Sequence, residues 1–140
     1  ESSILTITGR VKSNISEVTS KLEVNGKLEI NGAVYKNINT IADNKYDFRD
    51  TDNTVLFDTS KHAIVATLPP ANESRGRVLT IKKIAADEHK YKIKGSNKLT
   101  ITTEGEMIDF SKEIIITSNY STRVFHSDGN KWWIISRSGT

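Results

Sequence analysis

A tandem six-residue repeat near the amino terminus is the strongest constraint on how this chain folds. Its two copies are VNGKLE at residues 24–29 and INGAVY at residues 30–35. Each copy brings two aliphatic side chains and an Asn-Gly turn, which are too few to enclose a core within one chain. A single-chain solenoid needs about three or more such units to support itself. We therefore interpret the segment as the end of a shaft that several chains build together.

The aliphatic positions of the repeat are the expected contacts between chains in this shaft. Period-2 alternation before and within the repeat predicts strands, and the glycines fall where the backbone turns or approaches another chain closely. The spacing of Ile15, Val18 and Leu22 is compatible with a short helix as an alternative for the residues between these strands. The expected interchain core consists of Val24, Leu28, Ile30 and Val34.

The composition changes after the repeat in a way that predicts two parts. Residues 35–52 are polar and rich in Asp, Asn and Thr, which favours a neck or linker. We therefore expect a shaft and neck over residues 1–52 and a head domain over residues 53–140. The sequence begins at Glu1 and not at Met, from which we expect a processed or recombinant piece of a longer protein.

Short alternating segments separated by turn residues predict many strands in the head and no helix. A spacing of roughly 8–12 residues between successive strands is typical of sandwiches and jelly rolls. The expected fold class is all-β, with a jelly-roll-like β-sandwich head on a short β-structured shaft. The expected head strands cover residues 54–58, 63–68, 77–83, 91–94, 99–103, 113–118, 123–127 and 131–136.

The last two expected strands form the clearest hairpin of the sequence. Asp128, Gly129 and Asn130 lie between them, and Asp-Gly is a strong signal for a tight β-turn. Trp132 and Trp133 follow on the final strand, so their side chains point to opposite faces. One indole is expected in the core and the other at the surface or at a subunit interface.

The composition excludes several classes of function. The chain has no Cys, which rules out disulfides and thiolate-bound metal. Its 20 basic residues are spread among 17 acidic ones, whereas nucleic-acid binders cluster their positive charge, so no nucleic acid is expected as a partner. No apolar run in the sequence approaches the roughly 20 residues that span a bilayer, so no membrane insertion is expected.

Several short motifs follow one another through the head segment. They are IVATLPP at residues 64–70, GRVLTIKK at 76–83, LTIT at 99–102, MID at 107–109 and SDGNKWWII at 127–135. Their order resembles the carboxy-terminal head domains of viral and bacteriophage fibre proteins over about residues 54–136. The chain departs from the family pattern after Asp109, where Phe110 stands in the place of a frequent Gly.

The resemblance implies a function and a partner. Fibre heads of this kind are homotrimers on β-structured shafts, exposed on the virion surface, and they attach the particle to its host. We therefore expect a homotrimer that binds a host-surface glycan or protein receptor through multivalent contacts. Two alternatives stay open, namely a purely structural trimer that registers a longer fibre or decorates a capsid, and a carbohydrate-binding module.

No constellation in the sequence predicts catalysis, so we expect no enzyme, no cofactor and no metal site. The three histidines do not stand at metal-ligand spacing. His126, Ser127 and Asp128 are adjacent on a strand and point apart, so they are not expected to form a nucleophilic triad. The acidic stretch over residues 104–109 is interpreted as a solvated turn, in preference to a carboxylate pair or a cation site.

Lysine residues supply the sharpest charge feature of the head. Lys90, Lys92 and Lys94 alternate along one expected strand and line one of its faces. They indicate either an anionic ligand, such as a sulfated or sialylated glycan, or an edge strand that lysines protect from aggregation. The remaining ligand-binding candidates lie in loops that are expected to be exposed: Asn72, Arg75 and Asn97.

Overall fold

The chain divides into two compact units. The computed structural model describes residues 4–5, 21–85 and 97–139. The first unit is Glu1–Tyr35 and the second is Lys36–Thr140.

The first unit contains a two-stranded parallel sheet and the tandem repeat. Its strands are β1 (Ile4–Leu5) and β2 (Lys21–Leu22). Both Asn-Gly pairs of the repeat, at residues 25–26 and 31–32, form bends, as the repeat predicts. Residues 23–37 contain no strand in the single chain. The short helix considered as an alternative before the repeat lies outside the described residues.

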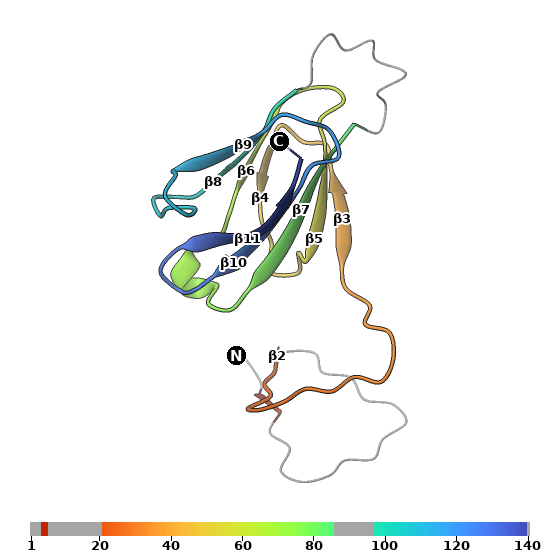
Figure 1. Cartoon of the computed structure of the whole chain (residues 1–140), viewed down its shortest axis with the longest axis vertical. Coiled ribbons are helices and arrows are strands. Elements are labelled where there is room, and N and C mark those ends of the chain that lie inside the picture. The colour runs from red at the N-terminus through yellow and green to blue at the C-terminus, as the bar shows by residue number, and fades with distance from the viewer. Residues whose placement is uncertain (1–3, 6–20, 86–96, 140) are drawn as a thin grey trace. The chain divides into compact units, whose positions relative to one another are not determined.

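The second unit is a β-sandwich. Its elements are β3 (Ile38–Ile41), β4 (Lys45–Asp47), β5 (Thr54–Asp58), β6 (Ile64–Thr67), the 3-10 turn η1 (Ala71–Glu73), β7 (Val78–Ile84), β8 (Leu99–Thr102), β9 (Glu113–Ile116), β10 (Thr122–Ser127) and β11 (Trp132–Ser138). One sheet has the strand order β11-β10-β7-β5-β3, and the sheet that faces it has the order β4-β6-β8-β9 (Figure 1). The all-β sandwich expected for the head is thus confirmed.

The chain crosses to the opposite sheet after each strand from β3 to β7, and this winding sets the direction of pairing. Two strands that are separated in sequence by one strand of the other sheet become neighbours and run parallel. The parallel pairs are β3 with β5, β5 with β7, β4 with β6, and β6 with β8. The antiparallel pairs are β7 with β10, β10 with β11, and β8 with β9. The sheets are therefore mixed, whereas a jelly roll is built from antiparallel strands.

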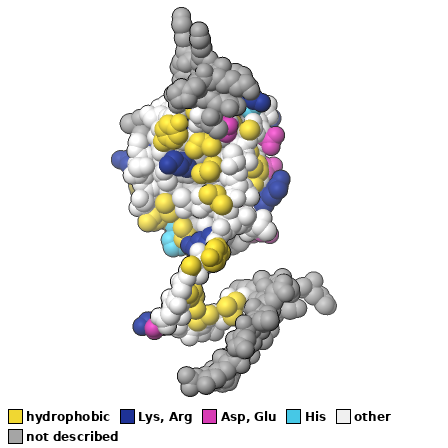
Figure 2. Space-filling model, turned by 90° about the vertical axis from the view of Figure 1, so that its right-hand side faces the viewer, with side chains coloured by type: hydrophobic (Ala, Val, Ile, Leu, Met, Phe, Trp, Pro, Cys, Tyr) yellow, Lys and Arg dark blue, Asp and Glu magenta, His cyan; other side chains and the backbone are white. Residues whose placement is uncertain are grey.

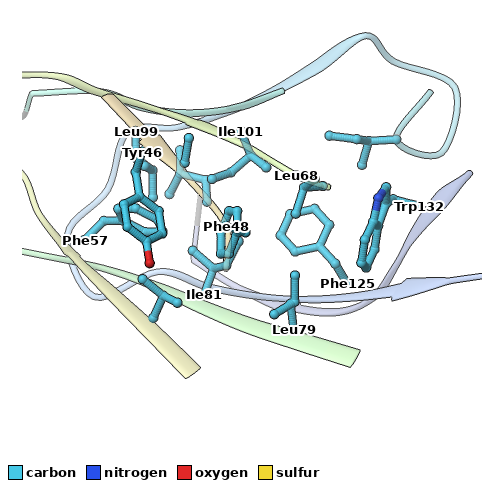
Figure 3. Close-up of a cluster of buried hydrophobic side chains, with 14 of the residues drawn as sticks. Tyr46, Phe48, Phe57, Leu68, Leu79, Ile81, Leu99, Ile101, Phe125 and Trp132 are labelled. Carbon is cyan, nitrogen blue, oxygen red and sulfur yellow. The ribbon is translucent and has the colours of Figure 1, made fainter. Parts of the chain in front are cut away.

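One hydrophobic core fills the space between the sheets, since alternate residues of each strand point inward. The rings of Tyr46, Phe48 and Phe57 pack edge to face, with centroids 5.6, 5.8 and 5.8 Å apart (Figure 3). Trp132 is fully buried away from these rings, and its indole N–H donates to the Pro69 carbonyl oxygen at 2.9 Å. The indole therefore contributes its apolar area without an unpaired buried donor.

The strands expected over residues 54–136 are present, apart from the one over residues 91–94, which lies outside the described residues. β5 has the expected bounds, and β10 and β11 form the expected hairpin. Trp132 points into the core and Trp133 is half-buried on the opposite face of β11, which confirms the expected division between the two indoles.

The sandwich begins earlier in the chain than expected. Residues 35–52, expected as a neck, contribute β3 and β4, so the boundary expected at residue 53 is displaced to Lys36. Tyr46 and Phe48 are buried there. β3 and β4 are edge strands, where many side chains face water, and the segment is polar for that reason.

Candidate functional site

The residues proposed from sequence as ligand-binding candidates differ in their location and contacts in the structure. Three of them lie outside the described residues: Lys90, Lys92 and Lys94. Asn97 has a structural role, since its Nδ2 donates to the Thr59 carbonyl oxygen at 2.7 Å. Asn72 is exposed in η1, and Arg75 is exposed just after η1, beside the turn between β10 and β11.

Asp128 organises the turn of the β10–β11 hairpin. Its Oδ1 accepts the backbone N–H groups of Asn130 and Lys131 at 2.8 and 2.9 Å. Gly129 has a φ of +93°, a left-handed conformation that glycine adopts without strain. The Gly129 N–H donates to Ser127 Oγ at 3.1 Å. Side chains at the start of the turn therefore fix its backbone.

Trp133 is fixed against the same carboxylate. Its indole Nε1–H donates to Asp128 Oδ2 at 2.8 Å. This hydrogen bond, followed by the backbone hydrogen bonds from Lys131 and Asn130, favours the ionised carboxylate and lowers the pKa of Asp128 from 3.8 to about 2. The half-buried indole is thus oriented at its nitrogen, while part of the ring stays open to solvent.

An exposed cluster of two aromatic rings and one ammonium group lies beside the turn. We call it the hairpin platform, and it consists of Phe110, Lys131 and Trp133. The two rings meet edge to face, with centroids 6.4 Å apart and an interplanar angle of 88°. The Lys131 Nζ lies 4.3 Å from the Trp133 centroid and 5.0 Å from the Phe110 centroid, within cation–π range. Because Phe110 is 82% exposed, the platform is a candidate contact surface.

The segment before Phe110 explains why this ring lies outside the core. Ile108 is buried and forms a parallel bridge with Trp132. The Asp109 N–H donates to the Trp132 carbonyl oxygen at 2.9 Å, and the Ile134 N–H donates to Asp109 Oδ1 at 3.0 Å. Asp109 itself has a φ of +52°, which turns the chain there. The turn at Asp109 therefore places the aromatic side chain of Phe110 on the surface.

A shallow depression of about 270 Å³ adjoins the platform. Its walls include Arg75, His126, Asp128, Trp133 and Ile135. His126 and Trp133 are register partners on β10 and β11, so they stand side by side on the outer face of the five-stranded sheet. Trp133 belongs to both the platform and the depression, and a ligand in the depression would contact the same indole.

Arg75 reaches the depression from η1. A Cβ atom placed on Gly129 would lie 3.3 Å from both Cγ and Cδ of Arg75, so the aliphatic stem of the arginine packs over the glycine. The guanidinium makes no hydrogen bond or ion pair with any residue in the described part of the chain. Its planar set of N–H donors is therefore available at the rim of the depression.

The polar residues beside the platform do not form a catalytic relay. Ser127 is buried, and its Oγ donates to the Ala71 carbonyl oxygen at 2.8 Å. His126 is exposed, and its Nε2 lies 3.2 Å from the Gly76 carbonyl oxygen. The two side chains point to opposite faces of β10, as expected. Across residues 4–5, 21–85 and 97–139, no group of three or more His, Asp or Glu side chains is placed to hold a metal ion.

Phe110 and Lys131 are members of the site that the sequence alone does not predict. The two signals that pointed toward them were the paired tryptophans and the replacement of a frequent Gly at position 110. The contact between Asp128 and Trp133 depends on the geometry of the hairpin, which motif spacing alone does not give.

No protein-family model matches this sequence, and no curated protein matches it at a significant level. Among the described residues, no helix has the length and hydropathy needed to cross a membrane. Among the described residues, the candidate functional features are the repeat in the first unit and the hairpin platform in the second.

Proposed function

We propose that this chain is the end of a homotrimeric viral or bacteriophage fibre, and that its sandwich head attaches the particle to its host. The hairpin platform carries the proposal, because Phe110 is 82% exposed and yet is packed by Lys131 and Trp133. Ordered aromatic side chains on a surface supply binding energy at a low entropic cost and are enriched in binding sites. The ligand is a glycan or a protein receptor on the host surface.

The first unit supports assembly from several copies. Val24, Leu28, Ile30 and Val34 are between 45% and 62% exposed in the single chain. Figure 2 shows hydrophobic side chains along the described part of this unit. Burial between copies stabilises an assembly by roughly 25 cal/mol for each Å² of apolar surface removed from water. Partner chains are therefore the natural cover for the repeat.

A trimer makes attachment multivalent. Once one head is bound, the next contact forms within the same particle, which raises avidity by about 10²–10⁴ without a new kind of contact. A shallow, open depression is compatible with such a role, because no single site has to bind tightly.

A carbohydrate-binding module is the second candidate function. The observation that favours it is the half-exposed Trp133 beside Phe110, since a module of this kind binds sugars on a solvent-facing aromatic platform. The module would work as a monomer, whereas the fibre requires a trimer, so the mass in solution separates the two.

Light scattering of the full chain, followed by a glycan and cell-surface binding assay on the same sample, tests the proposal. A trimer that loses surface binding in Phe110→Ala supports attachment. Ile115→Ala is the matched control, because Ile115 is an exposed apolar residue on β9 of the other sheet. A monomer that binds sugars supports the module. A trimer without surface binding, in which Phe110→Ala disturbs assembly, indicates a structural role and contradicts attachment.

A further inference from the structure

We infer that the depression beside the hairpin platform binds a pyranose ring that carries a carboxylate, the group shared by sialic and uronic acids. The inference rests on the proposed attachment function and names the ligand class of that same surface. Trp133 stacks on the apolar face of the sugar, and Arg75 pairs with its carboxylate.

Trp133 provides the stacking surface. A pyranose has a face of C–H groups that packs on an indole ring and a rim of hydroxyl groups that needs hydrogen-bond partners. The Nε1–H of Trp133 already donates to Asp128, so the ring is oriented before a ligand arrives and little order has to be created on binding. Phe110, edge to face with this indole, extends the apolar surface.

The acceptor groups around the depression are already used within the chain. The two carboxylate oxygens of Asp128 accept three N–H donors, one of them from Trp133. Ser127 Oγ accepts the Gly129 N–H. A neutral sugar presents O–H donors around its whole rim, and at Asp128 these donors compete with three N–H groups of the chain.

The group that remains available to a ligand in the depression is the guanidinium of Arg75, a cationic hydrogen-bond donor. The guanidinium of Arg75 has no partner among the described residues, and its planar fork matches a carboxylate through two parallel hydrogen bonds. Packing of its stem over Gly129 limits the positions that the fork can take. Lys131 adds a second positive charge beside Trp133. The guanidinium of Arg75 and the ammonium of Lys131 together favour an acidic ligand over a neutral one.

The chain provides an internal control for an NMR test, because its two indole groups differ in their surroundings. Trp132 is buried and bonded to the Pro69 carbonyl oxygen, whereas Trp133 lines the depression. In the full chain, sialyllactose and methyl glucuronide are expected to shift the Trp133 indole signal and to leave the Trp132 signal in place. Lactose and methyl glucoside, the neutral counterparts, are expected to need about tenfold higher concentration. The stronger of the two acids identifies the source of the carboxylate.

Charge variants test the role of Arg75. Arg75→Gln is expected to weaken binding of the preferred acid by about tenfold or more, and Arg75→Lys is expected to restore only part of it, because an ammonium lacks the fork. Lys61→Gln is the matched control, since it removes the same charge from an exposed position after β5. The register places that end of β5 beside the end of β7, whereas the hairpin adjoins the start of β7.

Each contrary outcome has a distinct meaning. Equal binding of acidic and neutral sugars, or unchanged acid binding in Arg75→Gln, overturns the acidic-ligand inference and leaves attachment standing. Absence of any sugar binding in a chain that still adheres to cells also overturns it and points to a protein receptor. Absence of both sugar binding and adherence overturns the inference together with the proposed function. A loss of oligomer mass in Phe110→Ala makes the platform a subunit contact and overturns the inference as well.

Discussion

The phenol O–H of Tyr46 donates a hydrogen bond to the Asp52 carboxylate at 2.8 Å inside the sandwich. The same carboxylate oxygen accepts the Arg49 N–H at 2.7 Å, and the other oxygen accepts Asn39 Nδ2 at 2.8 Å. One side chain thus joins β3, β4 and the turn after β4. It attaches a segment that is hydrophilic in sequence to the aromatic core.

Removal of this carboxylate is expected to destabilise the whole sandwich. Asp52→Ala should lower the free energy of unfolding by about 3 kcal/mol, since three donors lose their acceptor in a site that is only 4% exposed. Chemical denaturation of the two proteins measures the difference. Asp50→Ala, an exposed neighbour, should stay within about 0.5 kcal/mol of the parent. Equal losses in both variants would show that Asp52 has no special role.

Tyr46 is expected to make stability fall at alkaline pH. Burial, together with the hydrogen bond to Asp52, raises the pKa of Tyr46 from 10.0 to about 12. Because the folded pKa is higher than the unfolded one, the contribution is complete below pH 10 and is lost as the pH rises from 10 toward 12. Ultraviolet titration of the parent and of Tyr46→Phe isolates this phenol. A midpoint near 10 for Tyr46 would contradict its burial in the core.

Asp128 is expected to resist protonation until strongly acidic pH. Its folded pKa of about 2 lies below the ordinary 3.8, so the stabilisation of the turn is present above 3.8 and is lost as the pH falls toward 2. The Trp133 indole signal in NMR spectra should follow this titration, because Nε1–H donates to the carboxylate. Asp128→Asn should abolish the transition. A midpoint near 3.8 in the parent would mean that the hydrogen bonds of the turn do not form in solution.

Charged substitutions in the repeat are expected to disrupt assembly. Leu28→Asp or Ile30→Asp would place an unpaired carboxylate between copies, which costs several kcal/mol unless the chains separate, so the expected mass is that of a single chain. Lys27→Gln is the control in the same segment, since the Lys27 side chain is 85% exposed. Sedimentation measures the mass of each of the three variants and of the parent. Unchanged mass in the aspartate variants, or a single-copy parent, would contradict a shaft built from several chains.

Local pattern was sufficient to predict most strands of the head. β5 lies where alternation placed it, and the Asp-Gly turn before Lys131 produced the expected β10–β11 hairpin. These signals lie within a few residues of one another, so one sequence window contains them. The opposite orientation of Trp132 and Trp133 followed from the same reasoning, because successive residues of a strand alternate between its faces.

The features that local pattern did not reveal depend on contacts between distant residues. β3 and β4 are short, polar at the sequence level, and ordered by partner strands that come after the intervening chain. Phe110 owes its position to the bridge between Ile108 and Trp132, which no local spacing indicates. Arg75 was recognised as exposed, but its packing over Gly129 requires η1 and the hairpin to meet in space.

The winding of the chain between the sheets also sets the order in which the head is completed during synthesis. Among the described strands of the second unit, the β8–β9 and β10–β11 pairs join elements that follow each other directly, and both belong to the last part of the sequence. Each earlier strand of this unit pairs with a later strand that is synthesised only after at least one intervening strand. Such non-local pairing is slow, because the entropic cost of closing the loop arises before the stabilising contacts between the strands can form. The nascent head therefore gains lasting order from its carboxy-terminal end.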